Sequence, residues 1–462
     1  MTRDMTTGSP LRSILRFCAP LLIGNLFQQF YNLADSILVG RILGVQAFAA
    51  VGSTGALNFL ILGFALGVCS GLTIPIAQSF GAGDRELLRS RTGQLIWLGL
   101  GFSALITILT YFGTDNILRW TNTPAEIFDE AYRYIFIVFM GVGATMLYNL
   151  SSALLRALGD SRTPLHFLIA AVLVNVVLDI LLMRNLGMGV EGAAYATVAS
   201  QLAAGLACLI YIRKKVPLLH LRAEHIKPNL RGMGLLASVG VPMGLQFSIT
   251  AVGSIILQSA VNGLGAAAVA AVSAGAKVHN IVAAPLETCG VAMATYCGQN
   301  LGAARPDRIR QGLRSIKAVG FLYCVLAFLV NLFAGASIAT LFLSASEVEI
   351  LARVRQYLVV MGSAYPLLAL IFIFRNGLQG MGFSRQAMGA GAAELLARAL
   401  VAFCLVGRMG FTAVCLASPV AWLFADVLLL SLYRVEMKKL NTEPEALMCL
   451  QQHRKLAHAH GK

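Results

Sequence analysis

Charged residues are scarce in this chain of 462 residues, because Asp, Glu, Lys and Arg together account for only 12% of it. Soluble domains contain about 25%. The nine cysteines include no Cys-x-x-Cys pair, and the sequence has neither a His-Glu-x-x-His motif nor a Gly-x-x-x-x-Gly-Lys-Ser/Thr loop. These absences argue against an ordinary soluble domain, a disulfide framework, a zinc hydrolase and an ATP-binding loop within the chain.

Hydrophobic residues, by contrast, make up 57% of the chain and gather in long runs. A helix of about 20 apolar residues crosses the ~30 Å hydrocarbon core of a bilayer, and these runs lack the alternation of barrel strands. We therefore predict an all-α polytopic membrane protein. Its twelve transmembrane helices lie near 12–38, 46–80, 90–113, 127–154, 163–184, 189–212, 233–262, 266–299, 316–342, 350–377, 387–406 and 411–433.

The second half of the chain repeats the first after about 221 residues. Ala49-Ala50-Val51 returns as Ala270-Ala271-Val272, and the segment 78–83 returns as 299–304. This duplication predicts two pseudo-symmetric six-helix lobes, an architecture common among secondary transporters. The predicted parts are an N-terminal lobe at 1–212, a cytoplasmic linker at 213–232, a C-terminal lobe at 233–433 and a cytoplasmic basic tail at 434–462.

The net charge of +15 arises from 36 basic and 21 acidic residues, and most of the basic ones fall on one side of the predicted topology. They lie in the N-terminal segment, the linker, the tail and the loops of the same side, to which we also assign Arg375 and Arg385. By the positive-inside rule both termini are cytoplasmic. The charge therefore indicates orientation in a cytoplasmic (inner) membrane rather than binding to nucleic acid.

Short motifs follow one another in a characteristic order along the chain. They are Pro20 with Val39–Gly44 in the first span, Gln78-x-x-Gly81-Ala82, Arg156–Pro164, Val174–Asp179 and Gly187–Thr197. Together they resemble the multidrug and toxic compound extrusion (MATE) transporters. The resemblance implies two lobes around a central cavity and secondary active efflux of amphipathic, cationic small molecules in exchange for H⁺ or Na⁺. We expect a monomer that uses no cofactor and is not an enzyme.

Two carboxylates of the first half lie in apolar spans. Each costs about 2.5–3.5 kcal/mol at mid-membrane on insertion scales, so each is a candidate functional residue. Asp35 lies deep in the first span, and Asp179 follows Asn175 by one turn on one face of the fifth. In the resembled family the positions of Asp35, Asn175, Asp179 and Thr197 form a proton or cation site, and the sequence does not choose between H⁺ and Na⁺ at the two carboxylates. The simpler alternative is that these groups only hydrogen-bond to neighbouring helices.

Two local features of the helix backbone bear on this site. Pro20 lacks a backbone N–H and can therefore bend the first span. By resemblance, ion binding at Asp35 is coupled to that bending and to expulsion of the substrate. The family usually has a proline after the aspartate of the fifth span, but here Ile180 follows Asp179, so we expect no break there.

Other polar residues in the spans are candidates for lining a substrate cavity. Gln28, Tyr31 and Asn32 are spaced three to four residues apart, so they share a helix face with the aspartate of the first span. In the eighth span, Lys277 and Glu287 either line the cavity or form a buried pair.

The second half does not reproduce the candidate ion site. Ile256 stands where the first half has its aspartate, so ion coupling is expected in the N-terminal half. Glu394 and Arg398 are four residues apart and most simply neutralise each other. Asp426 also lies in a span and has no assigned role.

A second hypothesis in the same class is a flippase or exporter of a lipid-linked or polar metabolite, which Lys277 and Arg398 would favour as basic lining residues. A membrane-embedded enzyme would need a nucleophile–base or metal constellation, and the spans contain only the solitary His166 and His279. The expected partners are thus a small-molecule substrate and the lipid bilayer.

Overall fold

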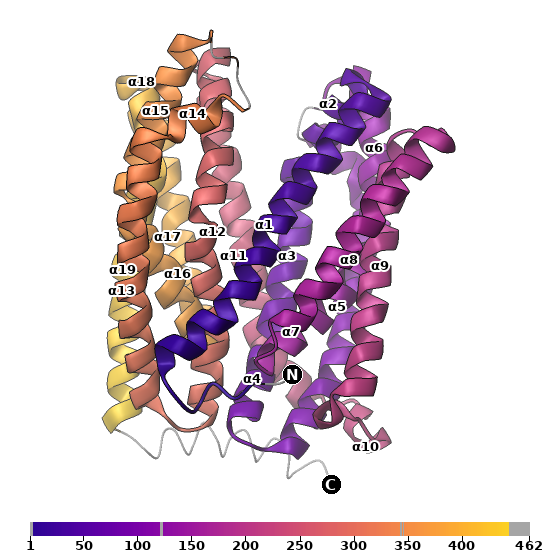
Figure 1. Cartoon of the computed structure of the whole chain (residues 1–462), viewed down its shortest axis with the longest axis vertical. Helices are drawn as coiled ribbons and strands as arrows, with labels where there is room; N and C mark the ends of the chain where they lie inside the picture. The colour runs from indigo at the N-terminus through magenta and orange to yellow at the C-terminus, as the bar shows by residue number, and fades with distance from the viewer. Residues whose placement is uncertain (1–2, 121–122, 342–343, 345, 443–462) are drawn as a thin grey trace. The chain divides into compact units, whose positions relative to one another are not determined.

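The computed structural model describes residues 3–120, 123–341, 344 and 346–442, and every regular element in this part of the chain is helical (Figure 1). Its first half contains α1 (Pro10–Leu43), α2 (Val45–Ser53), α3 (Gly55–Leu72), α4 (Ile74–Gly81), α5 (Arg85–Trp120), α6 (Ala125–Met140), α7 (Val142–Ala157), α8 (Arg162–Asp179), the π-helix η1 (Ile180–Asn185) and α9 (Val190–Lys215). These elements confirm the predicted all-α class.

The linker region contains a 3-10 helix, η2 (Pro217–Leu219), and α10 (Ala223–Ile226). The second half contains α11 (Leu230–Asn262), α12 (Ala266–Gly302), α13 (Pro306–Phe333), α14 (Gly335–Ala339), α15 (Val348–Ser363), α16 (Tyr365–Gly380), α17 (Ser384–Leu400), the π-helix η3 (Val401–Leu405), α18 (Val406–Met409) and α19 (Phe411–Thr442).

Among the described residues, nine helices are long and apolar enough to cross a membrane, and up to eleven spans result if two bent pairs each count as one. The pairs are α6–α7, bent by 46°, and α15–α16, bent by 50°. The 34-residue α1 is not among them, because polar residues such as Gln28, Gln29 and Asn32 lower its hydropathy. With α1 as the twelfth, the helices correspond to the twelve predicted spans.

The sequence duplication recurs in the backbone. Gly44 before α2 has a φ of 91° and Gly265 before α12 has a φ of 90°, so both turns use the left-handed conformation that favours glycine. At another matched pair of positions, φ is 70° at Gly83 and 56° at Ala304. Ala304 is the non-glycine residue with a positive φ in the described part of the chain, so the repeat preserves the turn even where the glycine is absent.

Residue contacts divide the described chain into two compact units. The first unit holds residues 3–4 and 19–248, and the second holds 5–18 and 249–442. The boundaries therefore fall inside α1, directly before Pro20, and inside α11. The predicted limits of the lobes and the linker follow the sequence repeat and stay predictions. Residues 443–462 of the predicted tail lie outside the described residues.

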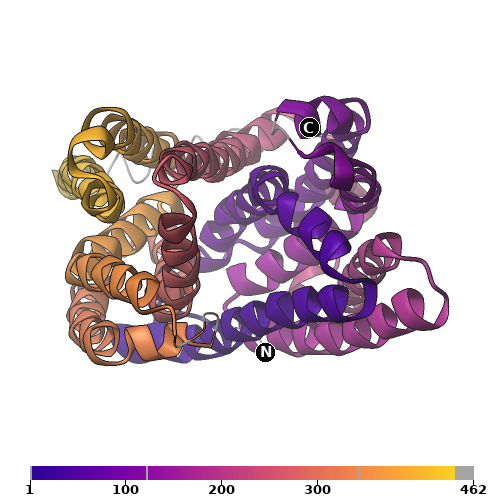
Figure 2. The ribbon, with the colours of Figure 1, turned by 90° about the horizontal axis from the view of Figure 1, so that it is seen from above.

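In the first unit, α7 and α8 pack against α9, and the end-on view in Figure 2 shows the magenta α8 and α9 side by side. The backbones of α3 and α11 approach very closely. A Cβ added at Gly67 would lie 2.6 Å from the carbonyl oxygen of Met243, and one at Gly71 would lie 2.6 Å from the Cα of Gly240. Small residues permit such contact between membrane helices.

In the second unit, α12 packs along α16, and α17 packs along α19. Buried apolar residues from four elements, Val261, Ala268, Val401 and Ala413, form part of one hydrophobic cluster. The same unit buries charged side chains of α16, α17 and α19, among them Arg375, Glu394 and Asp426.

Candidate functional site

The two carboxylates predicted to couple ions lie together in the first unit. Asp35 is on α1 and Asp179 is the last residue of α8, and their carboxyl groups lie within hydrogen-bonding reach of each other. Asp179 is 0% exposed, whereas Asp35 is half-buried. The fold thus joins two acids from distant parts of the sequence, one of them accessible and the other enclosed.

No hydrogen-bond donor from the described residues reaches the buried oxygens of this pair. Oδ1 of Asp35 and both carboxylate oxygens of Asp179 are without a partner, as are Oδ1 and Nδ2 of Asn175, which is 1% exposed. Buried polar groups are normally hydrogen-bonded, so several unpaired acceptors in one place need an explanation. A proton shared by the carboxyls satisfies them, and so does a hard cation, which takes oxygen ligands.

Hydroxyl groups surround the two acids. The Tyr31 hydroxyl lies 3.3 Å from Oγ1 of Thr197 on α9, so the structure brings this predicted residue to the site. Tyr134 of α6 is 6% exposed and interacts electrostatically with Asp35 and Asp179. The sequence analysis missed Tyr134, because a tyrosine on the buried face of an amphipathic helix is usually a packing residue. The only signal of Tyr134 in the sequence is its position on that helix face.

The expectation of no break after Asp179 is wrong. The α-helix ends at this residue and continues as the π-helix Ile180–Asn185, which changes the helical repeat without a proline. π-Helical turns have no simple sequence signature, so Ile180 gave no indication of the break. Pro20, in contrast, lies inside α1, which is one continuous helix, and its bending role stays a prediction.

The predicted cavity residues occupy two separate helices. On α1, the polar side chains bond to each other, since Nε2 of Gln28 donates to Oδ1 of Asn32 at 3.3 Å. On α12, Lys277 and Glu287 are both exposed and stand ten residues apart, about 15 Å of helix rise. That separation does not favour a buried pair, so lining a cavity is the interpretation we keep for these two residues.

Comparisons with known proteins identify the family of the chain. The MatE family model matches residues 20–181 and 242–404, which together are more than half of the chain. The chain belongs to the MatE family. The two matched segments of this MatE chain also correspond to the two copies of the sequence repeat.

The relatives of this MatE chain include two proteins of Bacillus subtilis. The probable multidrug resistance protein YpnP is 30% identical over 387 residues, which are 83% of this chain and 86% of the relative. The probable multidrug resistance protein YoeA is 32% identical over 321 residues, 68% of this chain and 69% of the relative. The outward-facing structure of a multidrug resistance MATE family transporter matches the fold with a TM-score of 0.87 at 22% identity, covering 94% of this chain and 97% of that one.

Membership of the MatE family identifies the chain as a multi-pass helical membrane transporter, not an enzyme, and confirms the predicted family and fold class. Members of the family transport without a cofactor. The identity of the ion and of the transported molecule are separate questions.

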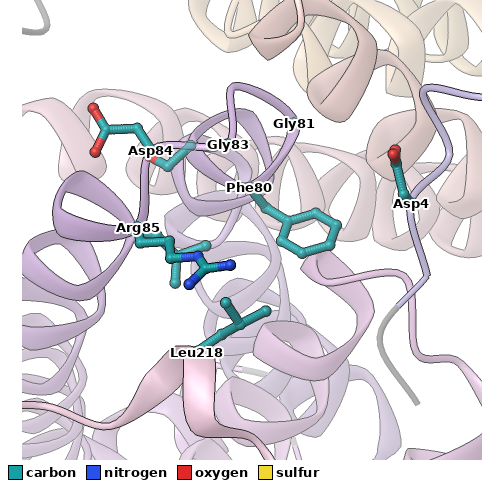
Figure 3. A pocket seen from close by; sticks show the side chains of 9 residues that line it. Asp4, Phe80, Gly81, Gly83, Asp84, Arg85 and Leu218 are labelled. Carbon is teal, nitrogen blue, oxygen red and sulfur yellow. The ribbon is translucent and has the colours of Figure 1, made fainter.

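A pocket elsewhere in the first unit of the MatE chain is not the coupling site. It has a volume of about 310 Å³ and lies where α4 ends and α5 begins (Figure 3). Arg85 reaches toward Phe80 and Leu218 there, while the carboxylate of Asp84 points away. The lining includes none of the residues predicted to couple ions.

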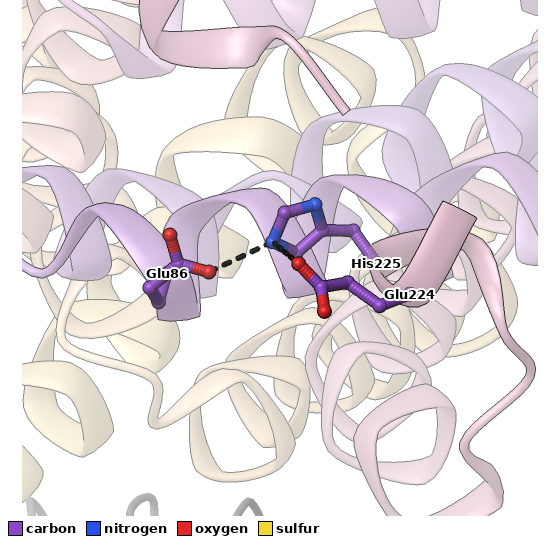
Figure 4. A group of neighbouring side chains, drawn as sticks. All are labelled: Glu86, Glu224 and His225. Carbon is purple, nitrogen blue, oxygen red and sulfur yellow. Dashed lines mark hydrogen bonds and ion pairs between the residues drawn. The ribbon is translucent and has the colours of Figure 1, made fainter. Parts of the chain in front are cut away.

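A group of side chains from α5 and α10 has the spacing of a metal site, but its hydrogen bonds do not favour one. Nδ1 of His225 accepts from the backbone N–H of Arg222 at 2.9 Å, so the proton of the neutral ring is on Nε2, which donates to Glu86 at 2.8 Å. A protonated ring nitrogen cannot bind a metal ion. The ring, with Glu224 beside it, instead fastens α10 to α5 (Figure 4).

The predicted pairing of Glu394 with Arg398 is present, with 3.3 Å between the guanidinium and Oε2. Arg375 binds the other carboxylate oxygen of Glu394. Arg375 falls near the end of the predicted span 350–377 and lies inside α16, where it is 7% exposed. The sequence analysis counted it with the basic residues of the cytoplasmic side and did not include it among the buried charges of the spans.

Proposed function

We propose that this MatE chain exports amphipathic, cationic small molecules in exchange for H⁺ or Na⁺, and that Asp35 and Asp179 bind the coupling ion. The observation that supports this most directly is the pair of carboxyl groups within reach of each other with no donor between them. Two acids in such contact need a proton or a cation to neutralise their repulsion. A purely structural pair would be expected to have donors from neighbouring helices.

Each residue of the proposed site has a distinct task. Asp35, half-buried on α1, receives the ion from the accessible side, and Asp179 holds it in the buried interior. Asn175 supplies a further oxygen, and the hydroxyl of Thr197 holds the Tyr31 phenol beside the acids. Loss of the ion restores net charge, which favours a different arrangement of α1 around the hinge at Pro20.

Either ion can drive this cycle. A membrane potential supplies about 2.3 kcal/mol per elementary charge per 100 mV. A proton gradient adds about 1.4 kcal/mol per pH unit. The oxygen set at Asp35, Asn175 and Asp179 suits Na⁺ as well as H⁺, and transport measurements distinguish them.

The proposed substrate class rests on the acids and on the relatives. A cationic substrate can neutralise the negative charge of the two acids. The relatives YpnP and YoeA are named as probable multidrug resistance proteins. We further propose that the chain acts as a monomer in the cytoplasmic membrane, with both termini on the cytoplasmic side, as the distribution of basic residues indicates.

Uptake into proteoliposomes tests the exchange. Purified wild-type protein is given a labelled aromatic cation under an imposed ΔpH, an imposed ΔNa⁺ or neither. We expect accumulation against the concentration gradient with one of the two ions, abolished by an ionophore for that ion. Equal uptake in all three conditions would contradict the proposal.

Counterflow tests the substrate class separately. Proteoliposomes loaded with the unlabelled aromatic cation should take up the labelled one faster than empty liposomes do. Exchange of a labelled isoprenoid-linked lipid, without exchange of the cation, would instead identify the chain as a lipid-linked metabolite transporter.

A further inference from the structure

The second unit contains its own buried ionic cluster, formed by α16, α17 and α19. Arg375, Glu394, Arg398 and Asp426 are each 3–7% exposed. Charged side chains in membrane helices are rare and usually functional, because their burial is costly. The cluster is separate from the site in the first unit, and nothing in the transport cycle above uses it.

Within the cluster the charges are unevenly paired. Glu394 accepts from two guanidinium groups, Arg375 at one carboxylate oxygen and Arg398 at the other. This leaves Nε of Arg375 and Nη1 of Arg398 buried without a hydrogen-bond partner in the described part of the chain. Glu394 is therefore paired with both arginines.

Asp426 has no such partner. It is 3% exposed, and neither of its carboxylate oxygens is hydrogen-bonded to any described residue. Arg375 lies within electrostatic range of Asp426 but donates to Glu394 instead. An ionised carboxylate enclosed without a donor is strongly disfavoured, whereas a protonated one is neutral.

Titratable groups on the other packed elements lie nearby but donate no bond to this carboxyl. His279 of α12 stacks on Trp422, one turn before Asp426, with 6.1 Å between ring centres. Lys317 of α13 lies over the ring of Phe374, 5.5 Å from its centre. The α15 phenol of Tyr357 interacts with Arg398, and Arg408 of α18 is exposed.

We propose that Asp426 is a second proton-binding site of this protein, controlled by the position of Arg375. While Arg375 is bound to Glu394, the carboxyl of Asp426 holds a proton. The Nε of Arg375 has no partner while the guanidinium is bound to Glu394. When this Nε donates to Asp426, the positive charge of the guanidinium stabilises the ionised carboxylate, and the proton leaves the carboxyl. Arg398 keeps Glu394 neutralised in both arrangements.

Infrared difference spectroscopy of the purified protein tests this without any transport substrate. The spectra at low and high pH are compared for the C=O stretching band of a protonated carboxylic acid. We expect the band to persist in the double variant Asp35→Asn/Asp179→Asn and to disappear from that background on adding Asp426→Asn. Asp115 forms an exposed ion pair with Arg119. The substitution Asp115→Asn is the matched control and should leave the band unchanged.

Arg375→Gln distinguishes a controlling role from a structural one. Without the guanidinium to stabilise the ionised acid, the band of Asp426 should persist to higher pH than in the wild type. A band that is absent from the double variant, or unaffected by Asp426→Asn, overturns the proposal, while leaving the coupling site of the first unit untouched.

Carbodiimide labelling of the wild-type protein provides a second measurement that depends on no variant. Dicyclohexylcarbodiimide reacts with protonated carboxyl groups in apolar surroundings, and mass spectrometry locates the adduct. We expect an adduct on Asp426 that declines as the pH rises. Adducts on other intramembrane acids but none on Asp426 at any pH would contradict a proton there.

Discussion

At the residue scale, Asn175 illustrates how a missing hydrogen bond separates function from stability. Its side chain is 1% exposed and its amide has no partner among the described residues. A buried amide contributes to stability through its hydrogen bonds, and this one makes none with the described residues. The coupling ion proposed above would supply the partner that the described residues do not.

We accordingly predict that Asn175→Ala lowers ion-driven uptake in proteoliposomes while changing the thermal stability of the ion-free protein by less than about 1 kcal/mol. Asn331→Ala is the matched control. Its amide donates to the carbonyl of Leu358 at 3.1 Å and to the hydroxyl of Tyr365 at 3.0 Å. Losing these bonds should cost about 1–3 kcal/mol. Equal destabilisation by both substitutions would mean that Asn175 has a structural role.

Sequence alone predicts the acids of the site and only part of their surroundings. Asp35 and Asp179 stand out because a carboxylate in an apolar run is unusual. Tyr134 does not, since its phenol is compatible with ordinary packing on a helix face. Arg375 was not counted among the buried charges for a related reason: it falls near the end of the predicted span 350–377, and only the packing of α16 against α17 reveals that it is buried.

At the scale of single elements, close backbone contact between α3 and α11 depends on residues without side chains. A Cβ at Gly71 would lie 2.6 Å from Cα of Gly240 and 2.9 Å from the carbonyl oxygen of Val239. Both obstacles are backbone atoms, so a side-chain rearrangement cannot relieve the clash.

Gly71→Ala should therefore destabilise the protein by about 1–3 kcal/mol, the usual effect of overpacking. The measurement is thermal unfolding in detergent. Gly101→Ala in α5 is the control, because a Cβ there meets nothing within 4 Å. It should be neutral or raise stability by up to about 1 kcal/mol, since alanine is the better helix former. A stable Gly71→Ala protein would contradict the close contact.

The linker is held along α5 by one buried side chain in particular. Gln94, 2% exposed, donates to the carbonyl of Lys227 at 3.0 Å and accepts from the backbone N–H of Asn229 at 2.9 Å. Trp97 adds a hydrogen bond to the carbonyl of Ile226 at 2.7 Å. The segment after α9 is thus an ordered part of the first unit, although its charge and prolines alone indicate only a connection.

We predict that Gln94→Ala loosens this linker, because both backbone groups lose their partners. Trypsin should then cleave the linker after Arg222 several-fold faster than in the wild type, and the fragments can be identified by mass spectrometry. Gln258→Ala, whose amide makes an exposed bond to Asn262, is the control. Unchanged cleavage in Gln94→Ala would indicate that other contacts suffice to hold the linker.

At the scale of the whole molecule, duplication explains the architecture and also what is specific to each half. Matched turns at Gly44 and Gly265, and matched π-helices after α8 and α17, show that the two copies share a backbone plan. The repeat and the apolar runs were sufficient to predict that plan. The π-helices could not be predicted, because they depend on tertiary packing rather than on a breaking residue.

The buried charges do not follow the repeat. The first half contains two facing acids, whereas Ile256 replaces the aspartate of α1 in the second half, and the ionic cluster there lies on other helices. The two halves of the duplicated scaffold therefore differ in which charged residues they bury and on which helices. The proposed transport cycle depends on the acids of the first half.

The most direct measurement compares two kinds of transport in the same proteoliposomes for wild type, Asp35→Asn, Asp179→Asn and the surface control Asp115→Asn. The account predicts that both site variants lose ion-driven accumulation at least about ten-fold, equivalent to ~1.4 kcal/mol, and keep substrate counterflow. The control should match the wild type in both assays. Undiminished ion-driven accumulation in both Asp35→Asn and Asp179→Asn would contradict the central claim that these two acids bind the coupling ion.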